Sequence, residues 1–233
     1  MRKEYKLALI TILIVLVIDQ SLKIWVKTHM LIGEDSYEHW GWAVSWFRLH
    51  FIENPGMAFG WMLPGKWGKL ALSLFRIVLV TLLSYYMVKV IKENRATWHF
   101  TFFLSLILAG ALGNLIDSAF YGLIFTESPS VYSAGAPAHF VKFGEGYAGF
   151  LQGRVVDMLF FPLCQCHMPN WVPIIGGRDF LFFNPIFNVA DSAVTIGTFG
   201  IILFKKKIET KINEDENNRQ SAQRTVSDTT ESI

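Results

Sequence analysis

Four long apolar stretches dominate the pattern of hydrophobic and polar positions along the chain. They cover residues 7–26, 70–91, 98–121 and 186–204. At ~1.5 Å per helical residue, each stretch is about long enough to cross a hydrocarbon core of roughly 30 Å. The pattern therefore predicts four transmembrane helices, joined by two long connections (residues 27–69 and 122–185) and one short turn.

The composition agrees with a membrane protein. Hydrophobic residues make up 52% of the 233 positions and charged residues only 17%, which is more apolar than soluble domains usually are. The net charge of +2 is too small to indicate binding to nucleic acid, and we expect no such partner.

Basic residues gather at three places beside the apolar stretches, which predicts the orientation of the chain. By the positive-inside rule these places are cytoplasmic, so both termini lie inside and both long connections face outward. The basic residues are Arg2, Lys3, Lys6, Lys89, Lys92, Arg95, Lys205, Lys206 and Lys207. Residues 1–207 form the predicted membrane domain, and the polar segment 208–233 is predicted to be a disordered cytoplasmic tail.

The first apolar stretch has an alternative interpretation as a cleaved signal peptide, because a basic start precedes "LALITILIVLVI". No small-residue cleavage site follows, which favours an uncleaved span. In the first outward connection, "WFRLHFIE" alternates with period two and predicts a strand with one apolar face, as part of a small sheet resting on the membrane.

The two cysteines, Cys164 and Cys166, lie in the second outward connection with one residue between them. A bridge between such close neighbours would be strained. A zinc site that adds His167 is a less favoured alternative, because three ligands would crowd into four positions. We expect two free thiols or an intermolecular bridge, and no metal.

Polar residues in the predicted spans are few, and they fall at a similar depth. Counted from the cytoplasmic ends, Asp19 and Asn114 lie roughly 18 to 24 Å into their spans, and Asp191 lies about 8 Å from the outer end of the fourth. Asp157, in the second outward connection, can reach the same layer. A shared layer of carboxylates predicts a shared site near the outer surface.

Helical spacing groups these residues further. Asp19 and Lys23 are spaced i, i+4 and can neutralise each other. Asn114 with Asp117, and Asn188 with Asp191, are each spaced i, i+3 and have no obvious cation nearby. The small residues Gly110 and Gly113 precede Asn114 and allow close approach of another helix.

Two carboxylates close together in a poorly solvated place share one proton, as in an aspartic protease. The ionised member can activate water while the protonated member donates to the carbonyl oxygen. The alternative from another class is a small ion-coupled transporter. Transport would also need access from the cytoplasm, and the polar residues stop short of the inner half.

Five segments carry a family resemblance. "IDQSLKIWV", "ENPGMAFG", "GALGNLIDSAFYG", "GRVVDMLFFP" and "FNVADSAVTIG" resemble, in order, the signature segments of the bacterial lipoprotein signal peptidases. The resemblance implies an all-α fold of four transmembrane helices with a small outward-facing β-sheet cradle. It implies an aspartic endopeptidase of the bacterial cytoplasmic (inner) membrane, without metal or cofactor, whose active site lies toward the outer leaflet.

The resemblance also implies substrates and site residues. The substrates would be diacylglyceryl-modified prolipoproteins, cleaved just before the lipidated cysteine, and globomycin-type peptide inhibitors and membrane lipid would be further partners. The catalytic pair would be Asp157 and Asp191. The supporting or substrate-contacting positions would be Asp19, Lys23, Asn54, Gly56, Ala58, Asn114, Asp117, Asn188 and Ala190.

Two departures from the family pattern lead to further expectations. Ser118 stands where the family commonly has arginine, and we hypothesise that Arg154 supplies the missing charge near the catalytic pair. The segments 123–152 and 164–171 are longer than in most relatives and are interpreted as insertions of unknown role.

Overall fold

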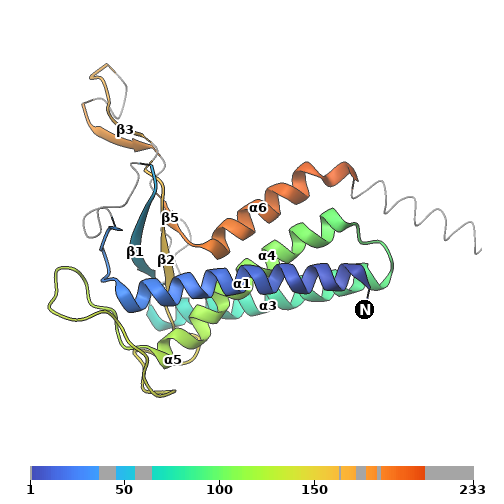
Figure 1. Cartoon of the computed structure of the whole chain (residues 1–233), viewed down its shortest axis with the longest axis horizontal. Coiled ribbons are helices and arrows are strands. Elements are labelled where there is room, and N and C mark those ends of the chain that lie inside the picture. Colours follow the sequence, from blue (N-terminus) through green and yellow to red (C-terminus); the bar gives the residue numbers. More distant parts are fainter. Residues whose placement is uncertain are drawn as a thin grey trace, which may run out of the picture.

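In the computed structural model of the chain, long helices lie side by side and a small sheet stands across one end of them (Figure 1). The structure describes residues 2–36, 46–55, 65–162, 164–171, 177–182 and 185–207. The predicted cytoplasmic tail and the site positions Gly56 and Ala58 lie outside the described residues.

The main helices follow the predicted apolar stretches. Three of them are long and apolar enough to cross a membrane, which confirms the predicted class of a mostly helical membrane protein with a small sheet. The fourth apolar helix, α6, is shorter. Their bounds are α1 Lys3–His29, α3 Gly65–Lys92, α4 Trp98–Ile116 and α6 Val189–Leu203.

The third predicted span continues beyond α4 through two short elements. A π-helical turn, η1, covers Asp117–Tyr121, and a final turn, α5, covers Gly122–Ile124. π-Helical turns inside helices occur often at functional sites. Here the turn carries Asp117 and Ser118, two of the polar residues singled out from the sequence.

The fourth predicted span, 186–204, begins later than predicted. Ile186–Phe187 forms strand β5, and α6 starts only at Val189. Asn188 ends the strand because its side chain caps the helix, accepting a hydrogen bond from the backbone N–H of Asp191. The 15-residue helix rises about 22 Å.

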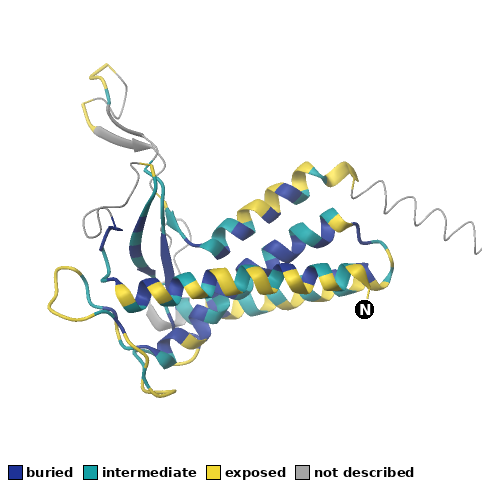
Figure 2. Cartoon of the chain, in the orientation of Figure 1, coloured by how far each residue is buried: buried dark blue, intermediate teal, exposed yellow. Residues whose placement is uncertain are grey.

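Apolar side chains cover the outer faces of the helices. Figure 2 shows exposed residues along α1 and α6, on the sides away from the neighbouring helices. A soluble protein would not expose so much apolar surface, whereas lipid is a suitable surrounding for it. Examples of these exposed residues are Leu13, Ile14, Val17, Phe75, Val78, Leu82, Ile196 and Phe199.

A three-stranded antiparallel sheet holds part of the site. Its strands are β1 (Arg48–Asn54), β2 (Val155–Phe160) and β5, with β2 in the middle. Leu49 and Phe51 are buried on one face of β1, which confirms the strand predicted there. The pairing of Asn54 with Val155 places the end of β1 beside the start of β2.

The second predicted insertion, residues 164–171, contains one strand of a separate two-stranded sheet. β3 (Cys164–His167) pairs antiparallel with β4 (Asp179–Phe182). In Figure 1 this ribbon projects away from the helices. The side chains of Cys164 and Cys166 lie outside those that the structure describes, so the prediction of two free thiols or an intermolecular bridge stays a prediction.

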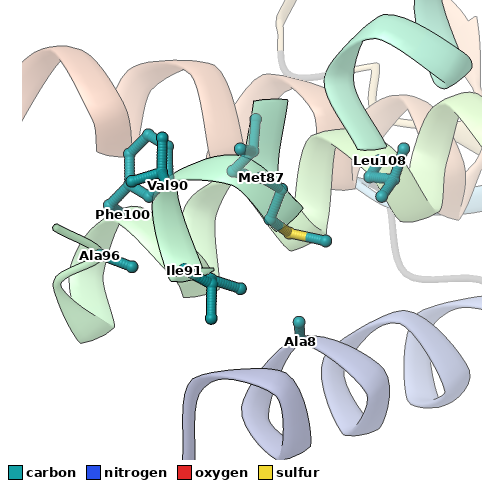
Figure 3. Close-up of a cluster of buried hydrophobic side chains, with 8 residues drawn as sticks. Ala8, Met87, Val90, Ile91, Ala96, Phe100 and Leu108 are labelled. Carbon is teal, nitrogen blue, oxygen red and sulfur yellow. The ribbon is translucent and has the colours of Figure 1, made fainter. Parts of the chain in front are cut away.

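Two apolar clusters hold the helices and the sheet together. One lies where the start of α1 meets the end of α3 and the start of α4, and it includes Ala8, Ile91 and Phe100 (Figure 3). The other joins the outer end of α1 to the sheet and includes Val26 and Phe51. The site described below lies between these two clusters along the helices.

Small residues bring α4 against α6 and α1, as predicted. A Cβ added to Gly110 would lie 2.2 Å from the backbone oxygen of Ala190, and one added to Gly113 would lie 2.7 Å from Oδ2 of Asp19. Real Cβ atoms do not approach other atoms so closely. The absence of side chains at these positions therefore lets polar groups of three helices meet.

Candidate active site

Lys23 joins two carboxylates at the centre of the helices. Its Nζ lies 2.9 Å from Oδ2 of Asp19 and 2.8 Å from Oδ2 of Asp117, and all three side chains are buried. The predicted pairing of Asp19 with Lys23 is confirmed. The expectation that Asp117 has no nearby cation was wrong, because the fold brings Lys23 from α1 against η1.

Asp19, Lys23 and Asp117 form an ionic cluster, and Gln20 extends it. The sequence did not predict this role of Gln20. Its Nε2 donates hydrogen bonds to Oδ1 of Asp117 at 2.9 Å and to Oδ2 of Asp19 at 3.1 Å. Its Oε1 accepts a hydrogen bond from the hydroxyl of Tyr121 at 3.1 Å. Gln20 was one of the few polar residues in its span, but nothing in the sequence gave it a partner.

The ionic cluster fixes the start of α6. Oδ1 of Asp19 accepts a 2.8 Å hydrogen bond from the backbone N–H of Ala190. That N–H belongs to the first turn of the helix, where the N–H groups have no partner within the helix and favour a negative charge. Asp19 thereby ties α1 to the residue directly before Asp191.

Asn114 connects the ionic cluster to Asp191. Its Oδ1 accepts a 2.9 Å hydrogen bond from Nζ of Lys23, and its Nδ2 donates a 2.7 Å hydrogen bond to Oδ1 of Asp191. The backbone N–H of Asn188 makes a longer contact, 3.4 Å, with the other oxygen of Asp191. The carboxylate of Asp191 is therefore held from two sides while its side chain stays partly exposed.

Asn188 connects Asp157 to the same amide network. Its Nδ2 lies 2.7 Å from Oδ1 of Asp157 and 3.1 Å from Oδ1 of Asn114. The side chain of Asn54, at the end of β1, also hydrogen-bonds Asp157. The two predicted catalytic carboxylates thus come from a strand and a helix, and adjacent amides hold both.

Asp157 has an unusual acidity. Its side chain is 5% exposed, and burial together with the negative charge of Asp191 raises the pKa of Asp157 to about 7. Hydrogen bonds from Asn188 and Asn54 act in the opposite direction and are weaker. A carboxyl group with such a pKa can exchange a proton near neutral pH.

Two arginines lie in the region, and they have different partners. Arg154 forms ion pairs with Glu53 at 3.0 Å and Glu127 at 2.9 Å. Arg76, from α3, donates a 3.0 Å hydrogen bond to Oγ of Ser118 and interacts electrostatically with Asp191, Asp117 and Asp157. Arg154 is thus paired with two glutamates, whereas the charge of Arg76 acts on the aspartates of the site, and the role hypothesised for Arg154 stays a prediction.

Sequence reasoning missed Arg76, although a signal was present. It is an arginine inside an apolar span, where a charge is costly and usually functional. Among the described residues, no group of three or more His, Cys, Asp or Glu side chains is arranged to hold a metal ion.

The fold and the site define a multi-pass membrane protein with a cluster of carboxylates and amides between its helices and a small sheet. The profile of the family described as Signal peptidase (SPase) II matches residues 11–206. Because this match covers most of the sequence, the chain belongs to the signal peptidase II family and is a protease.

Individual relatives agree with this assignment. A lipoprotein signal peptidase of Porphyromonas gingivalis is 46% identical over 186 residues, covering 80% of this chain and 76% of the relative. One of Amoebophilus asiaticus is 35% identical over 204 residues, covering 88% and 78%. A solved structure described as a bacterial membrane enzyme superposes with a TM-score of 0.53 at 25% identity, covering 86% of this chain and 87% of that one.

Membership of a protease family decides between the two hypotheses drawn from the sequence. The carboxylates are better interpreted as parts of a peptidase than as parts of an ion-coupled transporter.

Proposed function

We propose that the chain is an intramembrane aspartic endopeptidase that removes the signal peptide from diacylglyceryl-modified prolipoproteins. Cleavage would occur just before the lipidated cysteine. The observation that carries the proposal is the arrangement of Asp157 and Asp191, which are electrostatically coupled and held by the adjacent amides of Asn188 and Asn114. Lys23, the cation of the ionic cluster, binds Asp19 and Asp117 instead.

The pair is proposed to hold one proton. Asp157 is the more buried member and its raised pKa favours the protonated form. Asp191 is partly exposed and receives hydrogen bonds from Asn114 and from the backbone of Asn188, which favour a carboxylate. Asp191 is therefore proposed as the general base and Asp157 as the general acid.

Hydrolysis would then proceed in two steps. Asp191 takes a proton from water as the water oxygen attacks the scissile carbonyl carbon, and Asp157 gives its proton to the carbonyl oxygen. In the second step the C–N bond breaks, the leaving nitrogen takes the proton from Asp191, and Asp157 regains its proton as the product carboxyl group forms. The pair ends in its starting state.

The remaining residues are proposed to support this chemistry. Lys23 would pair with Asp19 and Asp117, while Asp19 holds the start of α6 and Asp117 accepts from Gln20. Asn54, Asn114, Asn188 and Ala190 would position the pair, and Gly56 and Ala58 would contact substrate. Globomycin-type peptides would occupy the same site as substrate.

The proposed location is the bacterial cytoplasmic membrane, with both termini inside and the site toward the outer leaflet. The basic residues near the start of α1, at the turn between α3 and α4 and after α6 support this orientation. The sheet, whose strand β2 carries Asp157, lies toward the opposite end of the helices, where the outer leaflet would be (Figure 1).

The test uses the purified protein in detergent micelles with a lipid-modified prolipoprotein. Asp157→Asn and Asp191→Asn should each lower the cleavage rate by at least about a hundredfold, because proton transfer by a positioned group contributes on that order. Glu145→Gln, at an exposed carboxylate, is the matched control and should cleave normally. Mass spectrometry should find the lipidated cysteine at the new N-terminus, and normal cleavage by both asparagine variants would overturn the proposal.

A further inference from the structure

Arg76 is a charged residue on α3, a helix whose exposed face is largely apolar. It lies 11 positions after Gly65, the first residue of α3, or about 16 Å along the helix. Asp19 lies 10 positions before His29, the last residue of α1, or about 15 Å from that end. The guanidinium contacts Ser118, the neighbour of Asp117, and therefore lies at the level of the ionic cluster.

Ser118 anchors the guanidinium. The hydroxyl of Ser118 donates to the backbone oxygen of Asn114 at 3.0 Å, so its oxygen is available to accept from Nη1 of Arg76, also at 3.0 Å. One turn before Arg76, Ser73 is buried and donates to the backbone oxygen of Leu151. These contacts turn this face of α3 toward η1 and the segment that leads into β2.

The charges around Arg76 come from every neighbouring element. Asp191 of α6, Asp157 of β2 and Asp117 of η1 interact with it, and Lys69 of α3 is a like charge nearby. On α1, Lys23 and Asp19 lie behind Asp117. Lys23 forms its ion pairs with Asp19 and Asp117, and its charge also acts on Asp157.

The hydrogen bonds on Asp157 and Asp191 come from amides and not from cations. Asn188 and Asn54 donate to Asp157, while Asn114 and the backbone of Asn188 donate to Asp191. Arg76 makes no direct ion pair with either carboxylate among the described residues, and it acts through its charge. Ser118 keeps this charge at a fixed position.

We propose that Arg76 is a positioning residue of the peptidase reaction, whose guanidinium, tied to Ser118, holds a positive charge beside Asp157 and Asp191 and stabilises the singly ionised pair. This inference rests on the function proposed above. A nearby positive charge favours ionised carboxylates and shifts their pKa values downward, typically by about one to three units. Without it, both proton losses of the pair should occur at higher pH.

The experiment is the pH dependence of kcat/KM for the whole protein, between about pH 4 and pH 9, with lipid-modified prolipoprotein. A pair that works with one proton gives a bell-shaped profile. Arg76→Gln should move the whole pH profile of kcat/KM to higher pH by about one unit. At pH values on its acidic side, kcat/KM should therefore fall about tenfold. Ser118→Ala should move the profile in the same direction by less, because the guanidinium loses its anchor.

Two variants separate a charge effect from a structural one. Arg76→Lys keeps the charge and should restore the position of the bell, even at a lower maximum rate. Lys89→Gln removes an exposed charge from the same helix, 13 positions or about 20 Å away, and should leave the bell in place. An Arg76→Gln profile that drops at all pH values without moving would overturn the inference.

Failure of the inference and failure of the proposed function give different results. If Asp157→Asn and Asp191→Asn are inactive and Arg76→Gln has the wild-type pH profile, the proposed catalytic pair is supported. The positioning role of Arg76 is then wrong. If both asparagine variants cleave normally, the proposed pair itself is wrong. If Arg76→Gln fails to fold, Ser118→Ala and Arg76→Lys test the inference in its place. A pH profile of Ser118→Ala at the wild-type position would then overturn the inference.

Discussion

The side-chain nitrogen of Asn188 donates a 2.7 Å hydrogen bond to the carboxylate of Asp157. The oxygen of the same amide caps α6 by accepting from the backbone N–H of Asp191 at 2.9 Å. One side chain therefore holds a strand carboxylate and sets the start of the helix that carries the other carboxylate. These two tasks use different atoms and can be separated by substitution.

Asn188→Asp keeps the oxygen that caps the helix and loses the amide donor. We expect helix stability to be retained, since aspartate caps as well as asparagine, while cleavage falls strongly because a third carboxylate faces Asp157. Asn188→Ala should lose both tasks. Cleavage rate and thermal unfolding of the two variants check this prediction.

The control for the cap is Thr97, whose side chain accepts from the backbone N–H of Phe100 at the start of α4. Thr97→Ala should destabilise the protein by about 1 kcal/mol and leave the activity of the folded enzyme near normal. Equal activity of Asn188→Asp and the wild type would contradict the role given to the amide.

Asp157→Asn should be inactive but more stable than the wild type at high pH. Because the pKa of Asp157 is raised to about 7, above the value of about 3.9 in an unfolded chain, its favourable effect on stability is complete below about pH 4. That effect is lost as the pH rises through about 7. Asparagine carries no charge and avoids this loss.

Thermal unfolding at pH 8 and near pH 4 checks this prediction. The variant should exceed the wild type at pH 8 by on the order of 1–4 kcal/mol, at 1.36 kcal/mol per pKa unit, and the difference should shrink near pH 4. Glu145→Gln, at an exposed site, should show no such dependence. A difference that is constant with pH would mean that Asp157 has an ordinary acidity in the folded protein.

Lys23→Met should destabilise the protein strongly. The substitution leaves Asp19 and Asp117 buried without their shared cation, and breaking a buried pair in this way typically costs about 3–5 kcal/mol. Adding Asp117→Asn should recover part of the loss, because one uncompensated charge disappears. Arg95→Gln, which breaks the surface pair with Glu93, should cost no more than about 1 kcal/mol.

Substitutions of Arg154 and of Glu53 should differ in their effects on the free energy of unfolding. Glu53 is buried against Lys27 and Ser128, and although burial opposes its ionisation, the charge of Lys27 and these hydrogen bonds lower the pKa of Glu53. Arg154→Ala removes a partly exposed partner and should cost about 1 kcal/mol. Glu53→Gln leaves Lys27 buried without an anion and should cost about 3–5 kcal/mol.

Cleavage assays complete the comparison of these two residues. The folded Arg154→Ala enzyme should keep nearly normal activity and an unshifted pH profile, because its ion pairs lie with Glu53 and Glu127. Lost activity at unchanged stability would instead support our first hypothesis, which placed the charge of Arg154 near the catalytic pair.

The sequence predicted those parts of the molecule that depend on local periodicity. Apolar runs located the helices, alternation located β1, and the i, i+4 spacing located the pair of Asp19 and Lys23. The shared depth of the polar residues also indicated one site. These signals work because a helix or strand imposes its own repeat on the residues that it buries.

The sequence could not predict contacts that depend on which helices are neighbours. Lys23 reaches Asp117, 94 positions later in the chain, and Arg76 reaches Ser118 only because α3 packs beside α4. The late start of α6 is different, since Asn188 and Asp191 form a capping box whose spacing was visible in the sequence. It was missed because the apolar residues before Asn188 suit a span as well as a strand.

Gly110→Ala should disrupt the site although it changes only one methyl group. Its Cβ would lie 2.2 Å from the backbone oxygen of Ala190 and 2.7 Å from a methyl group of Val194, so α6 must move away from α4. That movement would stretch the 2.7 Å hydrogen bond between Asn114 and Asp191, and a misplacement of about 1 Å can cost about a hundredfold in rate. Gly149→Ala is the matched control, because its nearest neighbour would be at an ordinary 4.0 Å. Cleavage assays and thermal unfolding of both variants test this, and normal activity of Gly110→Ala would show that the two helices need not be in such close contact for catalysis.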